Sequence, residues 1–336
     1  MKFESAILFA SCLYSAGIAF SAEPVGSTTL RKSTIQYKVA TEPYVILERA
    51  GVRAVIVDNQ SVDDEVLSGH QAGYNGVAAL SHAKQSKNLF VPSYSGLNFE
   101  AIHDGTVQEE AVLFEPRRAP MQLRVIDEFT CELYQHATPN WRLESCHRYH
   151  MLRDGTIEIT FECKPVDATF ANKYIGLQWA SYINQPKSLG IYFKGHPVND
   201  DSRNTRWILA TTPGHGRLST HLATNDQRVF PHDKDFPFTL LFSRSNYRFS
   251  QPWYFGKCRG MALVTMYRPE DMIRFTQSPS GGGGGNPAWD YQLLISDYRP
   301  GAIYQMVMRV MYTPFESIES IEQLTLLHRK ALGQIP

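Results

Sequence analysis

The sequence has no excess of charge of either sign, and after its first 20 residues it has no hydrophobic run long enough to cross a membrane. Lysine plus arginine and aspartate plus glutamate number 33 each among 336 residues, so no global field attracts nucleic acid or anionic lipid. We therefore expect no nucleic-acid partner and no integral membrane segment in the mature chain. A hydrophobic content of 43% with 20% charged residues is typical of a folded globular chain.

Several motifs of catalysis and cofactor binding are also missing. The glycine run 281–285 lacks the Gly-Lys-Ser/Thr ending of a phosphate-binding loop, and neither Gly-x-Ser-x-Gly nor His-Glu-x-x-His occurs. The sequence contains no Cys-x-x-Cys pair of the kind that binds zinc. These absences argue against nucleotide-dependent enzymes, α/β-hydrolases and zinc proteases, and we expect no cofactor.

The N-terminus reads as an export signal. An apolar stretch over 6–20 is too short to span a bilayer comfortably, and Ala19 and Ser21 are small residues suited to a cleavage site. We predict a signal peptide over 1–21 and a secreted or periplasmic protein, with lipoprotein-type cleavage before Cys12 as the alternative. Export permits disulfides.

The cysteines left after cleavage allow two readings. Cys131 and Cys146 flank a proline-containing segment and could pair across adjacent strands. Buried free thiols are the alternative.

The apolar pattern favours strands over helices. In 156–163, after an Asp-Gly turn typical of a hairpin, apolar residues occupy alternate positions, which puts Glu158 and Glu162 on the opposite face. Further strands are predicted over 54–57, 121–127, 131–134, 146–152, 175–183, 189–193, 207–210, 238–242, 261–267, 272–277, 291–295 and 304–312. A helical pattern occurs over 61–67 and 316–331. We predict an all-β fold, one large antiparallel β-sandwich domain over 22–336 with a short C-terminal helix over 316–331.

Three stretches suggest a family. They are 88–105, which contains NLFVP and GLNFEAIHDG, 141–146 (WRLESC) and 286–290 (NPAWD). Together they resemble secreted bacterial proteins of the galactose mutarotase-like, or β-supersandwich, group over about residues 45–315. No diagnostic catalytic signature of the group is matched. The resemblance implies a large sheet whose concave face binds sugar through His, Glu, Arg and Trp, in a group that includes epimerases, lyases and hydrolase domains.

A histidine and two carboxylates lie within five residues of one another. Glu100 and His103 are three apart, and Asp104 adjoins His103. On one loop the three could converge for acid–base work. We predict His103 as the catalytic proton shuttle and Glu100 and Asp104 as substrate-binding residues. A hairpin turn closed by Asp104 is the structural alternative, and a Ca²⁺ ion among Glu100, Asp104 and Asp290 is a further one.

The hairpin 144–163 and the segment 212–221 supply further candidates. If the polar hairpin face lines a cleft, Glu144 and Glu162 face one cavity, as paired carboxylates do in glycoside hydrolysis. We predict both as catalytic and Arg148 as substrate-binding; a solvated face with cross-strand ion pairs is the alternative. His215 has glycine on both sides, which permits close ligand approach, so it is a catalytic candidate or a turn histidine.

Two aromatic groups could stack on a sugar. Trp253 and Tyr254 are the first two of three consecutive aromatic residues, and we expect at least one of the three to be exposed. Trp289 and Asp290 follow the glycine run 281–285 and offer an apolar face and a hydroxyl acceptor. The alternative is a surface hairpin loop from which Trp289 returns to the core.

These candidates lead to one function and two alternatives. The favoured reading is an exported carbohydrate-active protein that binds a saccharide or polysaccharide in a cleft on one sheet face, with hydrolysis, elimination or epimerisation as its chemistry. The alternatives are a non-catalytic glycan-binding module and a structural protein of the cell envelope.

Overall fold

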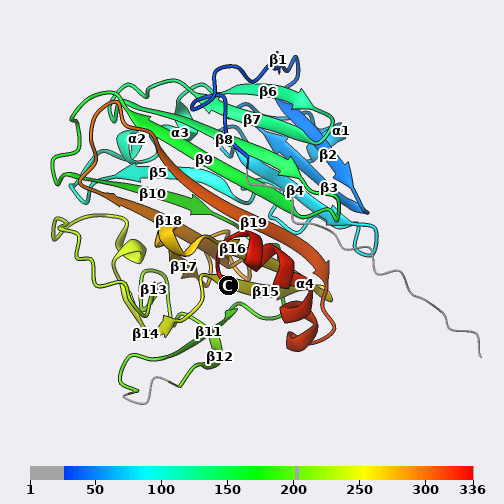
Figure 1. The fold of residues 1–336 in the computed structure, drawn as a ribbon, viewed down its shortest axis with the longest axis vertical. Coiled ribbons are helices and arrows are strands. Elements are labelled where there is room, and N and C mark those ends of the chain that lie inside the picture. Colours follow the sequence, from blue (N-terminus) through cyan, green and yellow to red (C-terminus); the bar gives the residue numbers. More distant parts are fainter. Residues whose placement is uncertain (1–25, 201–203, 336) are drawn as a thin grey trace, which may run out of the picture.

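The computed structural model describes residues 26–200 and 204–335, so the predicted signal peptide lies outside the described residues. They form a sheet of 16 strands and a second sheet of three (Figure 1). In spatial order the large sheet contains β1 (Lys38–Val39), β6 (Gln122–Asp127), β7 (Thr130–Gln135), β8 (Leu143–Met151), β9 (Ile157–Pro165), β19 (Tyr304–Pro314), β16 (Met261–Tyr267), β15 (Trp253–Cys258), β11 (Ile191–Pro197), β14 (Arg244–Phe249), β13 (Thr220–Ala223), β17 (Arg274–Ser278), β18 (Ala288–Ser296), β10 (Tyr174–Ala180) and β5 (Asn98–His103), while β12 (Arg206–Ala210) pairs with β11. β13 and β14 run parallel, whereas the long neighbours β8, β9, β19 and β16 are antiparallel. The predicted all-β sandwich is confirmed.

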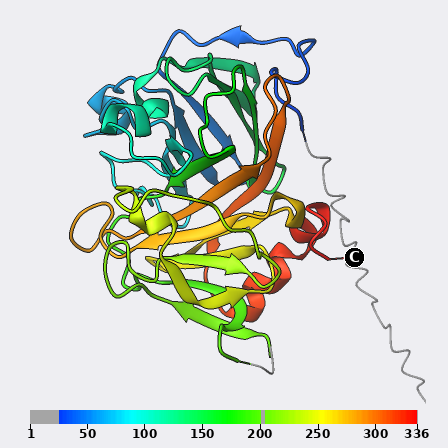
Figure 2. The same ribbon diagram turned by 90° about the vertical axis from the view of Figure 1, so that its left-hand side faces the viewer.

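The large sheet curls so that strands from its two ends face each other across the core. Trp179 of β10 stacks on Phe99 of β5 and on Tyr291 of β18, with ring centroids 5.1 Å apart in both cases. From the other end of the sheet, Phe161 of β9 lies 5.5 Å from Phe99 and 4.9 Å from Trp179. In Figures 1 and 2, β6–β9 lie in one half of the molecule and β11–β14 in the other, with β19 between them. Side chains that alternate with these core residues point away from the core.

The remaining elements cover the outer faces and edges. The small sheet contains β2 (Tyr44–Arg49), β3 (Val52–Val57) and β4 (Gly76–His82), and the helical elements are α1 (Asp64–Leu67), α2 (Glu110–Leu113), α3 (Glu115–Arg118), α4 (Ile318–Ala331) and two 3₁₀ turns, Thr239–Leu241 and Pro269–Asp271. The side chain of Ser317 caps α4 by accepting a hydrogen bond from the Ser320 backbone N–H. Ile321 of α4 packs in one cluster with Trp253 and Phe255, so α4 covers the outer face of β15 (Figure 1).

Most predicted elements are present, and two predictions are wrong. Residues 238–242 contain a 3₁₀ turn instead of a strand, because a short apolar run buries itself equally well in either conformation. Residues 98–103, read as a loop or turn, form the buried strand β5.

The four described cysteines, Cys131, Cys146, Cys163 and Cys258, are free and buried. Cys131 pairs with the core residue Tyr149, whereas Cys146 donates a hydrogen bond to Glu132 on the opposite face. The two side chains therefore point to different faces of the β7–β8 pair, and the suggested disulfide between them is excluded.

Candidate functional site

The aromatics expected to stack on a sugar are buried. Trp253, Tyr254 and Trp289 are at most 1% exposed. Tyr254 faces the sandwich core and Trp253 faces α4, so both faces of β15 are covered and the expected exposure is wrong. The indole N–H of Trp289 donates to the Leu189 carbonyl at 3.0 Å, which matches the reading in which Trp289 returns to the core.

His103 lies on the outer face of β5 in an apolar cage. Its ring contacts Phe236 and Phe242, with centroids 5.3 and 5.8 Å away, and neither ring nitrogen has a hydrogen-bond partner among the described residues. Burial lowers the pKa of His103 to about 3. Asp104 accepts hydrogen bonds from the backbone N–H and the hydroxyl of Thr106 in a local turn. The suggested hairpin is wrong, because β5 pairs with β10 and not with the strand that follows it in the sequence.

The polar face of the β8–β9 hairpin is occupied by the chain itself. Glu162 accepts hydrogen bonds from Thr28 and Arg31, and Gly26 lies directly against the guanidinium of Arg148. The alternation predicted for this hairpin is confirmed, but residues 26–31 lie where a cleft was expected. Glu162 and His103 are also on opposite sides of the core, so the structure does not bring them together.

Glu144 lies on the same face as Glu162, two positions along the β8–β9 ladder from the Cys146–Glu162 pair. Lys164 donates to it at 2.7 Å, and Tyr134 donates a second hydrogen bond. Burial alone would raise the pKa of Glu144, but these two partners outweigh it and leave the pKa below its usual value. Glu144 is therefore an ionised partner in a cross-strand pair.

The glycine run 281–285 is a tightly hydrogen-bonded loop. Gly282 and Asn286 exchange hydrogen bonds, and Gly283 and Gly285 have φ angles of 94° and 78°, which side-chain-bearing residues rarely adopt. A Cβ atom on Gly282 would lie 3.2 Å from the Cβ of Tyr182. The run thus lets the loop approach Tyr182 closely.

Tyr182 belongs to a cluster with the buried residues Glu100 and Asp290 and the half-buried Arg117, which we call the Glu100 site. The Tyr182 hydroxyl donates to Glu100 Oε1, and Arg117 Nη1 lies 3.5 Å from the same oxygen. Asp290 Oδ1 accepts the backbone N–H of Ser181 at 2.8 Å. Strands β5 and β18 flank β10 on either side, and this order brings Glu100 and Asp290 together although they are 190 residues apart in the sequence.

The carboxyl groups of Glu100 and Asp290 differ in the groups that shift their pKa values. Burial raises the pKa of Glu100, and the Tyr182 hydroxyl and the Arg117 charge partly offset this. Burial followed by the charge of Glu100 raises the pKa of Asp290 well above its usual value. The site therefore holds one carboxyl group that favours its proton and one whose ionised form has partners.

Two further aromatic rings lie beside the Glu100 site. Tyr94 lies 5.1 Å from Tyr74 and 5.4 Å from Tyr182, and the Arg117 guanidinium lies 3.9 Å above the Tyr74 ring. Tyr74 and Tyr94 are partly exposed. Arg117 also lines a surface hollow of about 460 Å³ next to α2 and α3.

His215 lies at the rim of the same sheet face. Its Nδ1 is 2.9 Å from the hydroxyl of Ser278. Ser278 lies two residues after Thr276 in β17, and Thr276 pairs with Asp290 of β18. Of the predicted residues, the structure therefore brings together Glu100 and Asp290, with His215 nearby. Sequence reasoning missed Arg117 and Tyr182, which carry no local motif.

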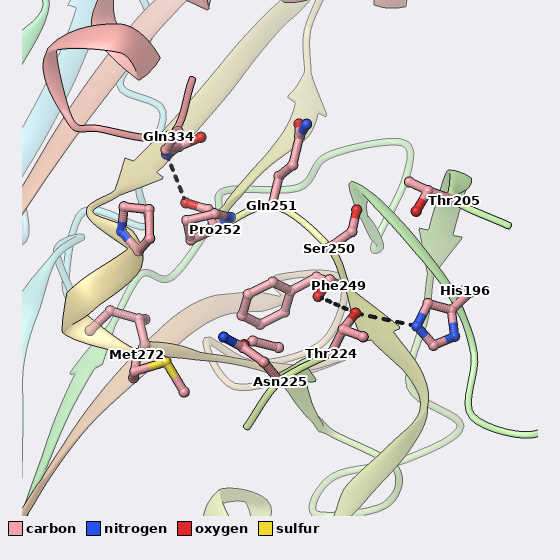
Figure 3. A pocket seen from close by; sticks show the side chains of 13 residues that line it. His196, Thr205, Thr224, Asn225, Phe249, Ser250, Gln251, Pro252, Met272 and Gln334 are labelled. Atoms are coloured by element: carbon pink, nitrogen blue, oxygen red, sulfur yellow. Dashed lines mark hydrogen bonds between the residues drawn. The ribbon is translucent and has the colours of Figure 1, made fainter. Parts of the chain in front are cut away.

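A pocket of about 490 Å³ lies elsewhere, between β13, β14 and the C-terminal residues (Figure 3). His196 Nε2 is 3.2 Å from the Thr224 hydroxyl, and Phe249 and Met272 supply apolar walls. The described residues that line it include no carboxylate, so it lacks an acid–base pair.

The described residues offer neither a metal-binding cluster nor a membrane-spanning helix. Within residues 26–200 and 204–335, no three His, Cys, Asp or Glu side chains are arranged to hold a metal ion. No helix of the described chain is long and apolar enough to cross a membrane.

Comparisons with known proteins give distant likenesses only. No family model and no curated protein matches the chain. An aldose epimerase homologue from C. elegans has a TM-score of 0.45 at 9% identity, over 83% of this chain and 100% of that chain. A galactose mutarotase-like protein from Lactobacillus casei ATCC 334 has 0.43 at 9%, over 80% and 99%, and galactose 1-epimerase from Lactobacillus acidophilus NCFM has 0.41 at 8%, over 84% and 100%. Their names belong to the group that the sequence resembles, but at such scores function has to be inferred from this chain's own residues.

Proposed function

We propose that the chain is an exported carbohydrate-active protein that binds a saccharide at the Glu100 site and carries out acid–base chemistry on it. The observation that carries the proposal is the meeting of two buried carboxyl groups, Glu100 and Asp290, with different partners. Hydrolysis, elimination and epimerisation of a sugar each need one group that gives a proton and one that takes it.

The surroundings of the two carboxyl groups support a different role for each. Asp290, whose pKa is raised well above its usual value by burial and by the charge of Glu100, serves as the acid. Glu100 serves as the base, because Tyr182 and Arg117 stabilise its ionised form. The rings of Tyr74 and Tyr94 offer an apolar surface against which a sugar ring can pack.

The experiment is a glycan-array screen of the purified chain, followed by incubation with each bound glycan. Mass spectrometry detects hydrolysis or elimination, and NMR detects epimerisation, which leaves mass unchanged. Glu100→Gln removes the base and should lower turnover by at least about 100-fold. Glu128→Gln, an exposed carboxylate with no described partner, is the matched control and should leave turnover unchanged.

Full turnover in Glu100→Gln would remove the base assignment. Failure to bind any glycan would remove the proposal as a whole.

A further inference from the structure

Several loops meet at the end of the sandwich where β10 ends and β18 begins. Arg259, in the tight turn between β15 and β16, donates to the carbonyls of Asn88 at 2.8 Å and Asn184 at 2.6 Å. Gln185, which follows Asn184, donates its backbone N–H to the side chain of Asn286, and Asn286 closes the glycine loop. The turn at Arg259 is thereby fixed to the segment that follows Tyr182.

Beside this junction lies a hollow of about 430 Å³, which we call the basic hollow. Its lining includes Lys187, Lys257 and Arg259, with Met261 and Phe315 as apolar walls. None of the described residues that line it is an aspartate or glutamate. In a chain whose formal net charge is zero, three cations around one hollow are a local concentration of positive charge.

No carboxylate of the described residues is paired with these cations. Arg259 donates to backbone carbonyls, and the Lys257 ammonium lies 4.7 Å from the Tyr192 ring centre and 4.8 Å from that of Phe315. Lys187 is exposed. In residues 26–200 and 204–335, none of the three takes part in an ion pair, so these residues supply no counter-ion to the cations that line the hollow.

The basic hollow and the Glu100 site are close along the chain. Tyr182 is five residues before Lys187, and an extended segment of that length spans at most about 17 Å. Asn184, which accepts from Arg259, lies between them. The two sites are therefore within the reach of one short oligosaccharide.

We propose that the saccharide is anionic and places a carboxylate or sulfate group in the basic hollow, against Lys187, Lys257 and Arg259. This inference rests on the proposed function, since it names the substrate class of the Glu100 site. Two backbone carbonyls hold the guanidinium group of Arg259, so its positive charge has a fixed position, while the two lysines supply mobile point charges.

The test compares binding of matched ligands to the full chain. One arm uses galacturonate oligomers against galactose oligomers, and a second uses sulfated against unsulfated dextran oligomers, each at low and high salt. We expect a charged ligand to bind at least about tenfold more tightly than its neutral counterpart, and the preference to shrink as salt screens the charges. The arm with the larger ratio identifies the anion.

The double variant Lys187→Met/Lys257→Met keeps the aliphatic stems and removes the charges. It should lose most of the preference for charged ligands and bind neutral ones unchanged, whereas Lys330→Met, on the exposed side of α4, should behave as the unmodified chain. Equal affinity for charged and neutral ligands, or a preference that survives in the double variant, would overturn this inference and leave the proposed function standing. No binding of any saccharide would overturn both.

Discussion

Tyr182 joins the glycine run to the buried carboxylates: its hydroxyl donates to Glu100, while Gly281 and Gly282 lie against the rest of its side chain. Because the run has no side chains, it can pack against Tyr182, which in turn holds Glu100 by a hydrogen bond. Trp289, which follows the run, is a core residue.

Alanine substitutions test this role of the glycine run. Gly281→Ala would put a Cβ 2.8 Å from the Cβ of Ala288 and 3.5 Å from the Tyr182 ring, so we expect a loss of about 1–3 kcal/mol in the free energy of unfolding and weaker ligand binding. Gly284→Ala is the control, because nothing lies within 4 Å of its Cβ position. Denaturant unfolding measures both, and equal stability of the two variants would contradict the close packing.

Buried histidines should make the protein sensitive to acid. Burial lowers the pKa of His103 and His147 to about 3 and that of His221 to about 4, against about 6.5 in an unfolded chain. As the pH falls below about 6.5, the unfolded chain takes up protons that the folded chain does not, so stability decreases. His103→Leu should reduce the slope of unfolding free energy against pH between 4 and 6 by about 1.4 kcal/mol per unit. An unchanged slope would show that His103 is protonated when folded.

A buried ion pair at Asp226 should be important for stability. Its carboxylate accepts from Arg274 at 2.9 Å and from Arg228 at 3.0 Å. Burial alone would raise the pKa of Asp226, but the two arginines outweigh it and lower the pKa to about 2. This contribution is therefore present above about pH 4 and is lost as the pH falls through about 2.

Asp226→Asn should cost about 3–5 kcal/mol in thermal or denaturant unfolding at neutral pH, because Arg274 stays buried without its partner. The control is Asp167→Asn, which breaks an exposed pair with Arg142 and should cost less than about 1 kcal/mol. Similar losses in the two variants would contradict the expected difference between buried and exposed pairs.

Residues 26–31 should stabilise the face that they cover. The hydroxyls of Thr28 and Thr29 donate to Glu162 and Glu132. Thr28→Val and Thr29→Val should each cost about 1.5–3 kcal/mol, the usual contribution of hydrogen bonds to charged groups. Ser27→Ala, at a partly exposed position, should cost little. Unfolding experiments in which all three variants match the unmodified chain would show that the segment is not held by these bonds.

The sequence allowed some of these features to be predicted. In β9, Ile157, Ile159 and Phe161 alternate with polar residues, and this local pattern correctly placed Glu158 and Glu162 on the other face. Nothing local showed that residues more than 100 positions earlier cover that face.

Burial that depends on distant contacts could not be predicted in the same way. Trp253 and Phe255 face a helix that begins more than 60 residues later, so a run of aromatics looked partly exposed. The sequence suggested Glu100 and Asp290 as substrate-binding residues, but not as an acid–base pair. Their meeting depends on β10 lying between β5 and β18, a long-range pairing without a local signal.

The proposed role of Asp290 as the acid at the Glu100 site is tested most directly by the turnover of Asp290→Asn on a saccharide that the unmodified chain converts. The substitution keeps the size of the side chain and an oxygen for the Ser181 N–H, but it removes the transferable proton. We predict that the variant binds the saccharide with unchanged affinity and turns it over at least about 100-fold more slowly. Turnover at the rate of the unmodified chain would contradict the account.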